Sequence, residues 1–130
     1  MKLARYSDEY FPSAPVLMVS IADLGESSIT KEFSALVDTG ADGTFVPTPI
    51  LEELDLPISY MTTARSHLGE NLHRVPVYKL DLILFGSIRL PGVEVIGDDW
   101  GDRIILGRNV LNFLKLSLDG PGKTISIEKT

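Results

Sequence analysis

The apolar residues of this chain come in short runs that are separated by turn-forming residues. The clearest run covers residues 77–85, where Tyr78, Leu80, Leu82 and Leu84 share one face of a strand and are predicted to be core. Further strands are predicted over residues 16–22, 29–37, 44–46, 115–118 and 124–128, and over 88–96 as one strand or two. About eight short strands, with turn signals every ~8–12 residues, predict an all-β sandwich or barrel.

Two short helices and an exposed hairpin interrupt this β pattern. Thr48 suits the N-cap of a helix over residues 49–54, because Pro49 can occupy the first helical position. A second short helix is predicted over residues 108–114. Residues 61–75 are mainly polar, and we expect them to form the exposed hairpin.

Length and composition are those of one globular domain. The chain has 130 residues, of which 44% are apolar. Residues 1–15 are polar and contain prolines, so we interpret them as an N-terminal arm that precedes a domain over residues 16–130. No apolar stretch approaches the ~20 residues that span a bilayer, and the charged first residues lack the apolar region of a signal peptide. We therefore expect a cytoplasmic protein with no membrane partner.

Charge and cysteine content narrow the chemistry. A net charge of −6 and the absence of a run of Lys or Arg argue against a nucleic-acid partner. The chain has no cysteine, which excludes disulfides, thiolate metal sites and cysteine nucleophiles. His67 and His73 have no third metal ligand near them in the sequence, so exposed histidines are favoured over a zinc site. We expect no metal and no organic cofactor.

The strongest chemical signal is the segment Ala35-Leu36-Val37-Asp38-Thr39-Gly40-Ala41-Asp42. An apolar strand leads directly into Asp38, so the strand determines where the carboxylate lies. Gly40 allows a turn that a side chain would obstruct, and Thr39 is able to form a local hydrogen bond that holds the loop. Asp-Thr-Gly alone is a common turn sequence, and a simple turn aspartate is the alternative interpretation of Asp38.

A second signal is the segment Ile-Ile-Leu-Gly-Arg-Asn-Val-Leu at residues 104–111. Together the two segments resemble the retropepsin family, the aspartic proteases of retroviruses and their bacterial and eukaryotic relatives. In that family two apolar residues precede Asp-Thr-Gly-Ala-Asp, and two more precede Gly-Arg-Asn. Both motifs match residue by residue, and the resemblance covers residues 16–118. It implies a small closed or half-closed β-barrel with one short helix near the C-terminus, which forms a two-fold dimer.

The chemistry that the resemblance implies is hydrolysis of a peptide bond by a water molecule. Such hydrolysis needs a base and an acid, and two adjacent carboxylates that share one proton supply both. The chain contains one Asp-Thr-Gly, so the second Asp38 has to come from another copy. A two-fold axis between identical subunits places two copies of one residue side by side. We therefore expect a homodimeric aspartic endopeptidase that acts on peptide or protein substrates.

The resemblance also implies roles for individual residues. The catalytic residues are Asp38, Thr39 and Gly40, with Thr39 bonding across the dimer axis. The residues implied to contact substrate are Ala41, Asp42, Gly69, Trp100 and Ile105. The residues implied to support the active-site loop are Gly107, Arg108 and Asn109, with Arg108 forming a buried ion pair to Asp42. The hairpin over residues 61–75 is the implied flap, which closes over the peptide.

Several alternatives stay open at this point. Asp42 and Arg108 are also consistent with solvated surface charges. Trp100 suits a pocket wall and a rim position packed on the flap equally well. Residues 61–75 contain one glycine, Gly69, whereas retroviral flaps are glycine-rich. This difference favours the alternative function, a retropepsin-fold dimer that binds peptides or mediates assembly with little turnover, because lid closure completes such sites. A protein that cleaves only itself or one partner is a third interpretation.

Overall fold

The computed structural model describes residues 2–26, 31–65 and 72–129. Within these residues the helices are α1 (Thr48–Glu53) and α2 (Arg108–Leu111). The strands are β1 (Lys2–Arg5), β2 (Val16–Ala22), β3 (Glu32–Val37), β4 (Thr44–Pro47), β5 (Tyr60–Arg65), β6 (Leu72–Leu84), β7 (Ile88–Asp98), β8 (Ile104–Leu106), β9 (Leu114–Asp119) and β10 (Thr124–Lys129).

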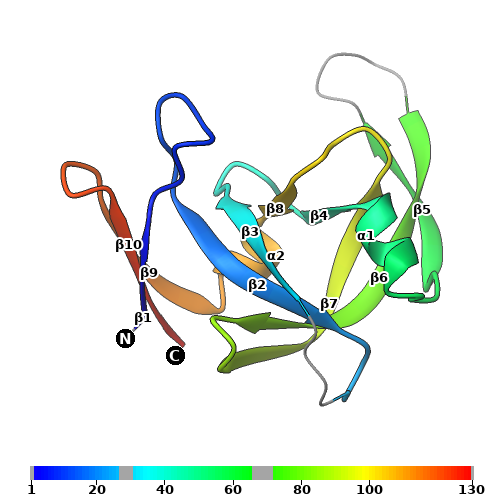
Figure 1. Ribbon diagram of the computed structural model, residues 1–130. Helices are drawn as coiled ribbons and strands as arrows, with labels where there is room; N and C mark the ends of the chain where they lie inside the picture. The colour runs from blue at the N-terminus through cyan, green and yellow to red at the C-terminus, as the bar shows by residue number, and fades with distance from the viewer. Residues whose placement is uncertain (1, 27–30, 66–71, 130) are drawn as a thin grey trace.

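The larger sheet closes into a barrel. Its strand order is β2-β3-β8-β4-β7-β6-β5, and a second pairing between β2 and β6 joins the first strand to the sixth. Six strands therefore surround the core, while β5 extends beyond the ring as one strand of the β5–β6 hairpin (Figure 1). The prediction of a closed or half-closed β-barrel is confirmed, and the barrel is closed.

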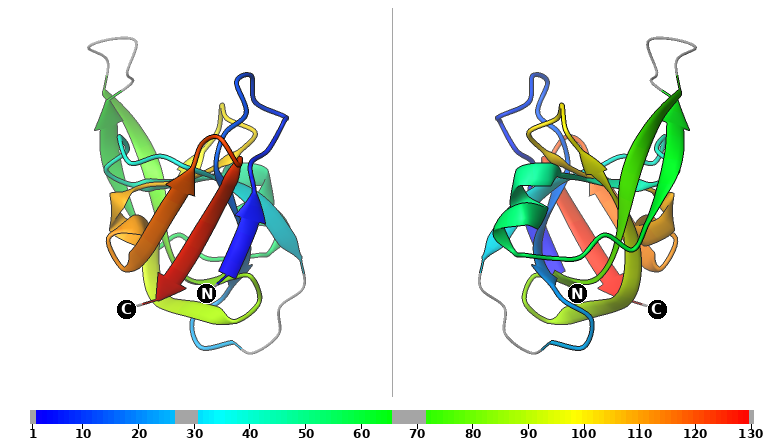
Figure 2. Two further views of the ribbon diagram at one scale, coloured as in Figure 1. Left: turned by 90° about the vertical axis from the view of Figure 1, so that its left-hand side faces the viewer. Right: turned by 90° about the vertical axis from the view of Figure 1, so that its right-hand side faces the viewer.

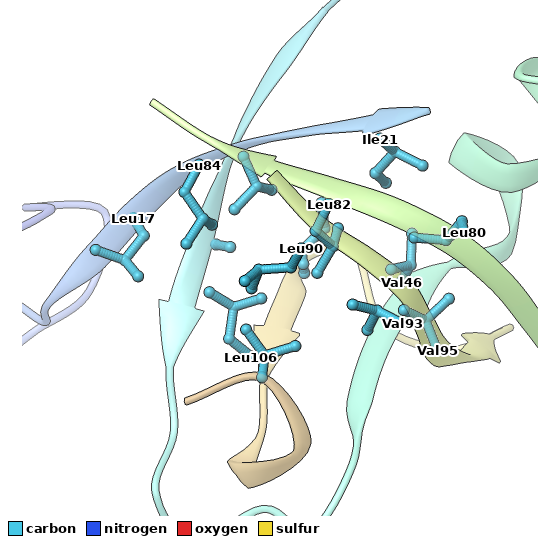
Figure 3. Close-up of a cluster of buried hydrophobic side chains, with 14 of the residues drawn as sticks. Leu17, Ile21, Val46, Leu80, Leu82, Leu84, Leu90, Val93, Val95 and Leu106 are labelled. Atoms are coloured by element: carbon cyan, nitrogen blue, oxygen red, sulfur yellow. The ribbon is translucent and has the colours of Figure 1, made fainter. Parts of the chain in front are cut away.

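The interior of the barrel is filled by apolar side chains that alternate along the strands. Figure 3 shows how side chains from several strands meet in one cluster, among them Leu17, Val46, Val95 and Leu106. The stripe predicted from the alternation of residues 77–85 is part of this core, and all four of its side chains are buried. Alternation has this effect because successive side chains of a strand point to opposite faces.

A second, three-stranded sheet is built from both ends of the chain. Its order is β1-β10-β9, and all of its strands are antiparallel (Figure 2). Ile125 and Ile127 of β10 are buried and belong to the same apolar cluster as the barrel. The segment that we interpret as an N-terminal arm thus contains a strand that pairs with β10 of its own chain.

Both predicted helices form, with differences at their ends. Thr48 was expected to cap α1, but the N-cap position is Pro47 and no side chain caps the helix. The Thr48 hydroxyl instead donates a hydrogen bond to Asp99 across 2.7 Å. Helix α2 begins at Arg108 as predicted and ends at Leu111, because Leu114 already starts β9. No helix in the described part of the chain is long and apolar enough to cross a membrane.

A single strand, β7, covers the region where one strand or two were expected. Gly92 adopts a positive φ of 65°, and the β6–β7 register shifts between Leu80 and Leu82. At this shift the carboxylate of Asp81, with 2% of its residue surface exposed, accepts hydrogen bonds from the backbone N–H groups of Gly92 (2.9 Å) and Gly25 (3.0 Å). Arg89 forms an ion pair with it at 2.8 Å. The irregularity is therefore held by a buried charge.

The pKa of Asp81 reflects these contacts. Burial alone raises the pKa, but the two backbone N–H groups and Arg89 together outweigh burial, so the pKa lies below its ordinary value. Since the folded-state pKa is depressed, the ionised carboxylate stabilises the fold above the ordinary pKa of ~3.9, and that contribution disappears as the pH falls through the lower folded value.

We predict that Asp81→Asn lowers the free energy of unfolding by about 3 kcal/mol at neutral pH, because it removes the buried charge from the ion pair with Arg89. The difference from the native protein should shrink as the pH falls below ~4. Urea unfolding across this pH range measures both effects. Asp55→Asn, at an exposed position, is the matched control. A difference that stays constant with pH would contradict the assignment of the effect to the Asp81 charge.

Candidate active site

The two sequence motifs lie side by side because β3 and β8 run in parallel. Val37 of β3 is the register partner of Leu106 of β8, so both strands end at the same edge of the barrel. The Asp38 N–H donates to the carbonyl of Leu106 across 3.0 Å. The loop over residues 38–43 then crosses to β4, at the end of the barrel that also carries the 99–103 loop (Figure 1).

The Asp38 carboxylate is positioned by its own loop. Its Oδ1 accepts a hydrogen bond from the N–H of Gly40 at 3.0 Å. The backbone carbonyl of Asp38 accepts one from the N–H of Ala41 at 3.2 Å. Asp38 is half-buried while Thr39 and Gly40 are exposed. In the single chain the carboxylate is therefore oriented and accessible.

Gly40 lies directly beside the Asp38 carboxylate. Its φ is outside the positive region, so the turn itself does not require glycine. A Cβ at this position would lie 3.2 Å from Oδ1 of Asp38, which is closer than ordinary van der Waals contact. The absence of a side chain leaves space beside the carboxylate rather than relieving backbone strain.

Gly107 packs against the backbone of the loop that follows Asp38. A Cβ on Gly107 would lie 2.1 Å from the carbonyl oxygen of Gly43 and 2.9 Å from that of Ala41. The backbone of the loop thus occupies the place of a side chain, and no residue larger than glycine fits. Two hydrogen bonds accompany the contact, from the N–H of Arg108 to the carbonyl of Ala41 (2.9 Å) and from the N–H of Gly107 to Oγ1 of Thr44 (3.1 Å).

A buried hydroxyl extends this contact into the barrel. Thr44 is fully buried, and its Oγ1 donates to Oδ1 of Asn109 across 2.7 Å. Asn109 in turn donates through Nδ2 to the carbonyl of Glu94 across 2.9 Å. Through these two hydrogen bonds Asn109 links β4, α2 and β7. Sequence reasoning missed Thr44, although its position directly after the Asp42-Gly43 turn in an apolar strand was a usable signal.

Arg108 binds the other side of the same loop. Its Nη1 donates to the carbonyl of Thr39 across 2.8 Å, and its Nη2 pairs with the carboxylate of Asp42. The ion pair was expected to be buried, and this was wrong for the single chain: the side chains of Arg108 and Asp42 are 45% and 92% exposed. Both groups sit at the surface because α2 and the loop meet on the outside of the barrel.

The remaining predicted residues fall in different places. Ile105 is half-buried in β8, opposite the buried faces of Ile104 and Leu106. Trp100 is 76% exposed, and its ring lies 5.5 Å from that of His73 on β6, which corresponds to the rim position packed on the hairpin. Gly69 and His67 lie outside the described residues. Across the described ranges, no three His, Cys, Asp or Glu side chains gather as a metal site.

A groove of about 190 Å³ adjoins the end of the Asp38 loop. Its walls are mainly apolar, and across one side the Tyr60 hydroxyl of β5 donates a hydrogen bond to Oε2 of Glu94 on β7. The residues that line it are Gly43, Thr44, Tyr60, Thr62, Val77, Glu94, Ile96 and Asn109. Sequence analysis did not single out Tyr60 or Glu94, because they are distant in the chain and belong to no motif.

Comparison with known sequences identifies the family. The profile of the family described as "gag-polyprotein putative aspartyl protease" matches residues 29–113, which include both motifs. The chain therefore belongs to this family of retropepsin-like aspartic proteases. No curated protein matches the sequence significantly.

Solved structures share the fold. The retropepsin-like aspartic protease from Rickettsia conorii aligns with a TM-score of 0.63 and 16% identity, over 95% of this chain and 86% of that one. The retroviral protease-like domain of Ddi1 from Leishmania major aligns with a TM-score of 0.57 and 15% identity, over 90% of each chain. The Simian Foamy Virus (mac) protease aligns with a TM-score of 0.54 and 22% identity, over 75% of this chain and 92% of that one.

Gly107→Ala is predicted to destabilise the fold by at least about 3 kcal/mol, because the new methyl group would overlap backbone atoms of the Asp38 loop. Gly120→Ala is the control, since a Cβ there meets nothing within 4 Å, and it should change stability by less than about 1 kcal/mol. Thermal unfolding of both variants measures the difference. Equal stability of the two variants would show that the loop moves aside at little cost.

The exposed ion pair leads to a different expectation. Asp42→Asn should cost less than about 1 kcal/mol, because both partners are solvated in the single chain. Arg108→Ala should cost more, about 1–2 kcal/mol, since it also removes the hydrogen bond to Thr39. Urea unfolding at a concentration where sedimentation shows monomers is the appropriate measurement. A loss of about 3–5 kcal/mol for Asp42→Asn would mean that the pair is buried after all.

Proposed function

We infer that this chain is one subunit of a homodimeric aspartic endopeptidase, in which the two Asp38 carboxylates activate a water molecule for hydrolysis of peptide bonds. One observation carries the proposal. The accessible carboxylate of Asp38 is held in a fixed orientation at the end of the barrel. The loop that carries it packs against the Gly107–Asn109 segment. The family membership of the chain supports the same reaction class.

The need for two subunits follows from the chemistry. General acid–base hydrolysis requires a group that accepts a proton from water and a group that protonates the carbonyl oxygen of the peptide. Each chain supplies one Asp-Thr-Gly. Two carboxylates brought together on a two-fold axis cannot both ionise easily, so they share a proton and titrate as a pair. The protonated member then serves as acid and the ionised member as base.

We assign the other predicted residues to roles around the two Asp38 carboxylates. We assign Thr39, which is exposed beside Asp38, to a hydrogen bond across the dimer axis. Ala41 and Asp42 border the bound peptide, and Ile105 lies on the half-buried face of β8 at the same edge of the barrel. We also assign substrate contacts to Trp100, in the 99–103 loop, and to Gly69, in the predicted flap. Peptides and proteins are the proposed substrates, and the water molecule is the nucleophile.

A mixing experiment tests the shared site directly. Asp38→Asn should reduce cleavage of a mixed peptide library by roughly 10³-fold or more, while the dimer still forms. In an equal, re-equilibrated mixture of native and Asp38→Asn subunits, roughly one quarter of the dimers carry two native carboxylates. We therefore expect activity to fall to about one quarter of that of native protein at the same total concentration. Cleavage should be assayed from about pH 3 to pH 8, since the pair loses its shared proton at high pH.

Two outcomes would count against the proposal. Activity of one half in the mixture would show that each subunit works alone. No cleavage by a well-formed native dimer, at any pH in the range, would favour a dimeric module that binds peptides with little turnover. Asp55→Asn, at an exposed position away from the loop, should behave like the native protein in both assays.

A further inference from the structure

The groove next to the Asp38 loop combines apolar walls with an anionic rim. Val77 and Ile96 are cross-strand partners on β6 and β7, and Tyr60 is the partner of Val77 on β5, so the three side chains share one face of the sheet. Gly43, where the Asp38 loop ends, contributes another wall. Glu94 supplies the one carboxylate among the lining residues. A substrate side chain that enters the groove therefore passes apolar surface and meets a negative group.

The Glu94 carboxylate is held in place at this rim. The Tyr60 hydroxyl donates a hydrogen bond to its Oε2. That hydrogen bond, reinforced by burial and by the charge of Glu94, raises the pKa of Tyr60, so the phenol remains a donor over the physiological range. Within the described residues, no protein donor contacts Oε1 of Glu94. The protein thus fixes one oxygen of the carboxylate, while the other accepts no hydrogen bond from the described residues.

The position of Glu94 is tied to the active-site loop. Its carbonyl accepts the hydrogen bond from Asn109, whose own Oδ1 accepts the bond from Thr44. The same side chains thus fix the Asp38 loop and the strand that carries Glu94. Lys79 is the cross-strand neighbour of Glu94, but in the described part of the chain the two form no ion pair. Among the described residues, no cation is therefore in direct contact with this negative charge.

We propose that this groove selects a substrate side chain with an apolar stem and a cationic end, a lysine or an arginine, whose charged group binds Glu94. This rests on the proposed function, because it names the kind of peptide that the same site cleaves. Long basic side chains bury their methylene stems against apolar surface while the charged head remains near solvent, which matches a groove with a charged rim. The net charge of −6 also attracts basic peptides during encounter.

The test is a set of peptides in which Lys, Met or Glu occupies each position in turn around one scissile bond. Methionine is the neutral reference, because its unbranched side chain fills apolar space in a similar way. At one position the native enzyme should cleave the Lys peptide with a kcat/KM roughly five to ten times that of the Met peptide. Glu94→Gln should reduce this ratio to about one, because the variant removes the charge that distinguishes the Lys peptide from the Met peptide.

Charge reversal gives a sharper readout than loss of charge. Glu94→Lys should prefer the Glu peptide over the Lys peptide at the same position, because the sign of the rim is inverted. Glu32→Gln is the matched control: Glu32 is exposed at the start of β3, at the opposite end of that strand from Asp38, and this variant should keep the native Lys preference. Since Glu94 is itself exposed, all three variants are expected to fold, and thermal unfolding checks this.

The outcomes separate the two proposals. Cleavage with no Lys preference at any position, or a preference that survives in Glu94→Gln, would overturn the role of the groove while leaving the protease intact. If the native dimer cleaves none of the peptides, the protease proposal fails. Binding of the same peptides, fluorescently labelled, then tests whether the groove prefers a basic side chain. A Lys preference in Kd that Glu94→Gln abolishes would support it, and equal binding or no binding of the Lys and Met peptides would overturn it.

Discussion

The close approach of Gly107 to the backbone of the Asp38 loop is the constraint on which the site depends. With 2.1 Å between the carbonyl oxygen of Gly43 and the place of a Cβ on Gly107, the loop backbone occupies the space that a side chain would need. This contact lets the N–H groups of Gly107 and Arg108 bond to Thr44 and Ala41. A carboxylate used for proton transfer needs a fixed position, and rigid backbone contacts supply it better than long side chains do.

Several strands of the barrel meet at this contact between Gly107 and the Asp38 loop. The parallel pair β3 and β8 delivers both motifs to one edge, while β4 and β7 carry Thr44 and Glu94 to the same region. Besides the pairing of β6 with β7, two side-chain contacts connect the β5–β6 hairpin to the barrel, from Tyr60 to Glu94 and from His73 to Trp100. The walls of the groove thus come from strands that are far apart in the sequence but neighbours in the closed sheet.

The expectations that were wrong share one physical cause. The Arg108–Asp42 pair forms, but at the surface, because whether a contact is buried depends on what packs outside it. Thr48 lies next to α1 but bonds to Asp99, since a side chain that caps a helix in isolation takes another partner when the fold presents one. The residue type indicated that a polar interaction would form, but its burial and its partner depended on the neighbouring elements.

By itself, the sequence determined the β class, the core stripe of residues 77–85 and the identity of the two motifs. Alternation and short motifs are local properties, so they can be read from neighbouring residues. Only the tertiary structure decided the pairing of β2 with β6, the place of β1 beside β10, and the meeting of Thr44, Asn109 and Glu94. These contacts depend on which strands become neighbours and in which register, and a pattern of period two specifies the face of a strand but not its partner.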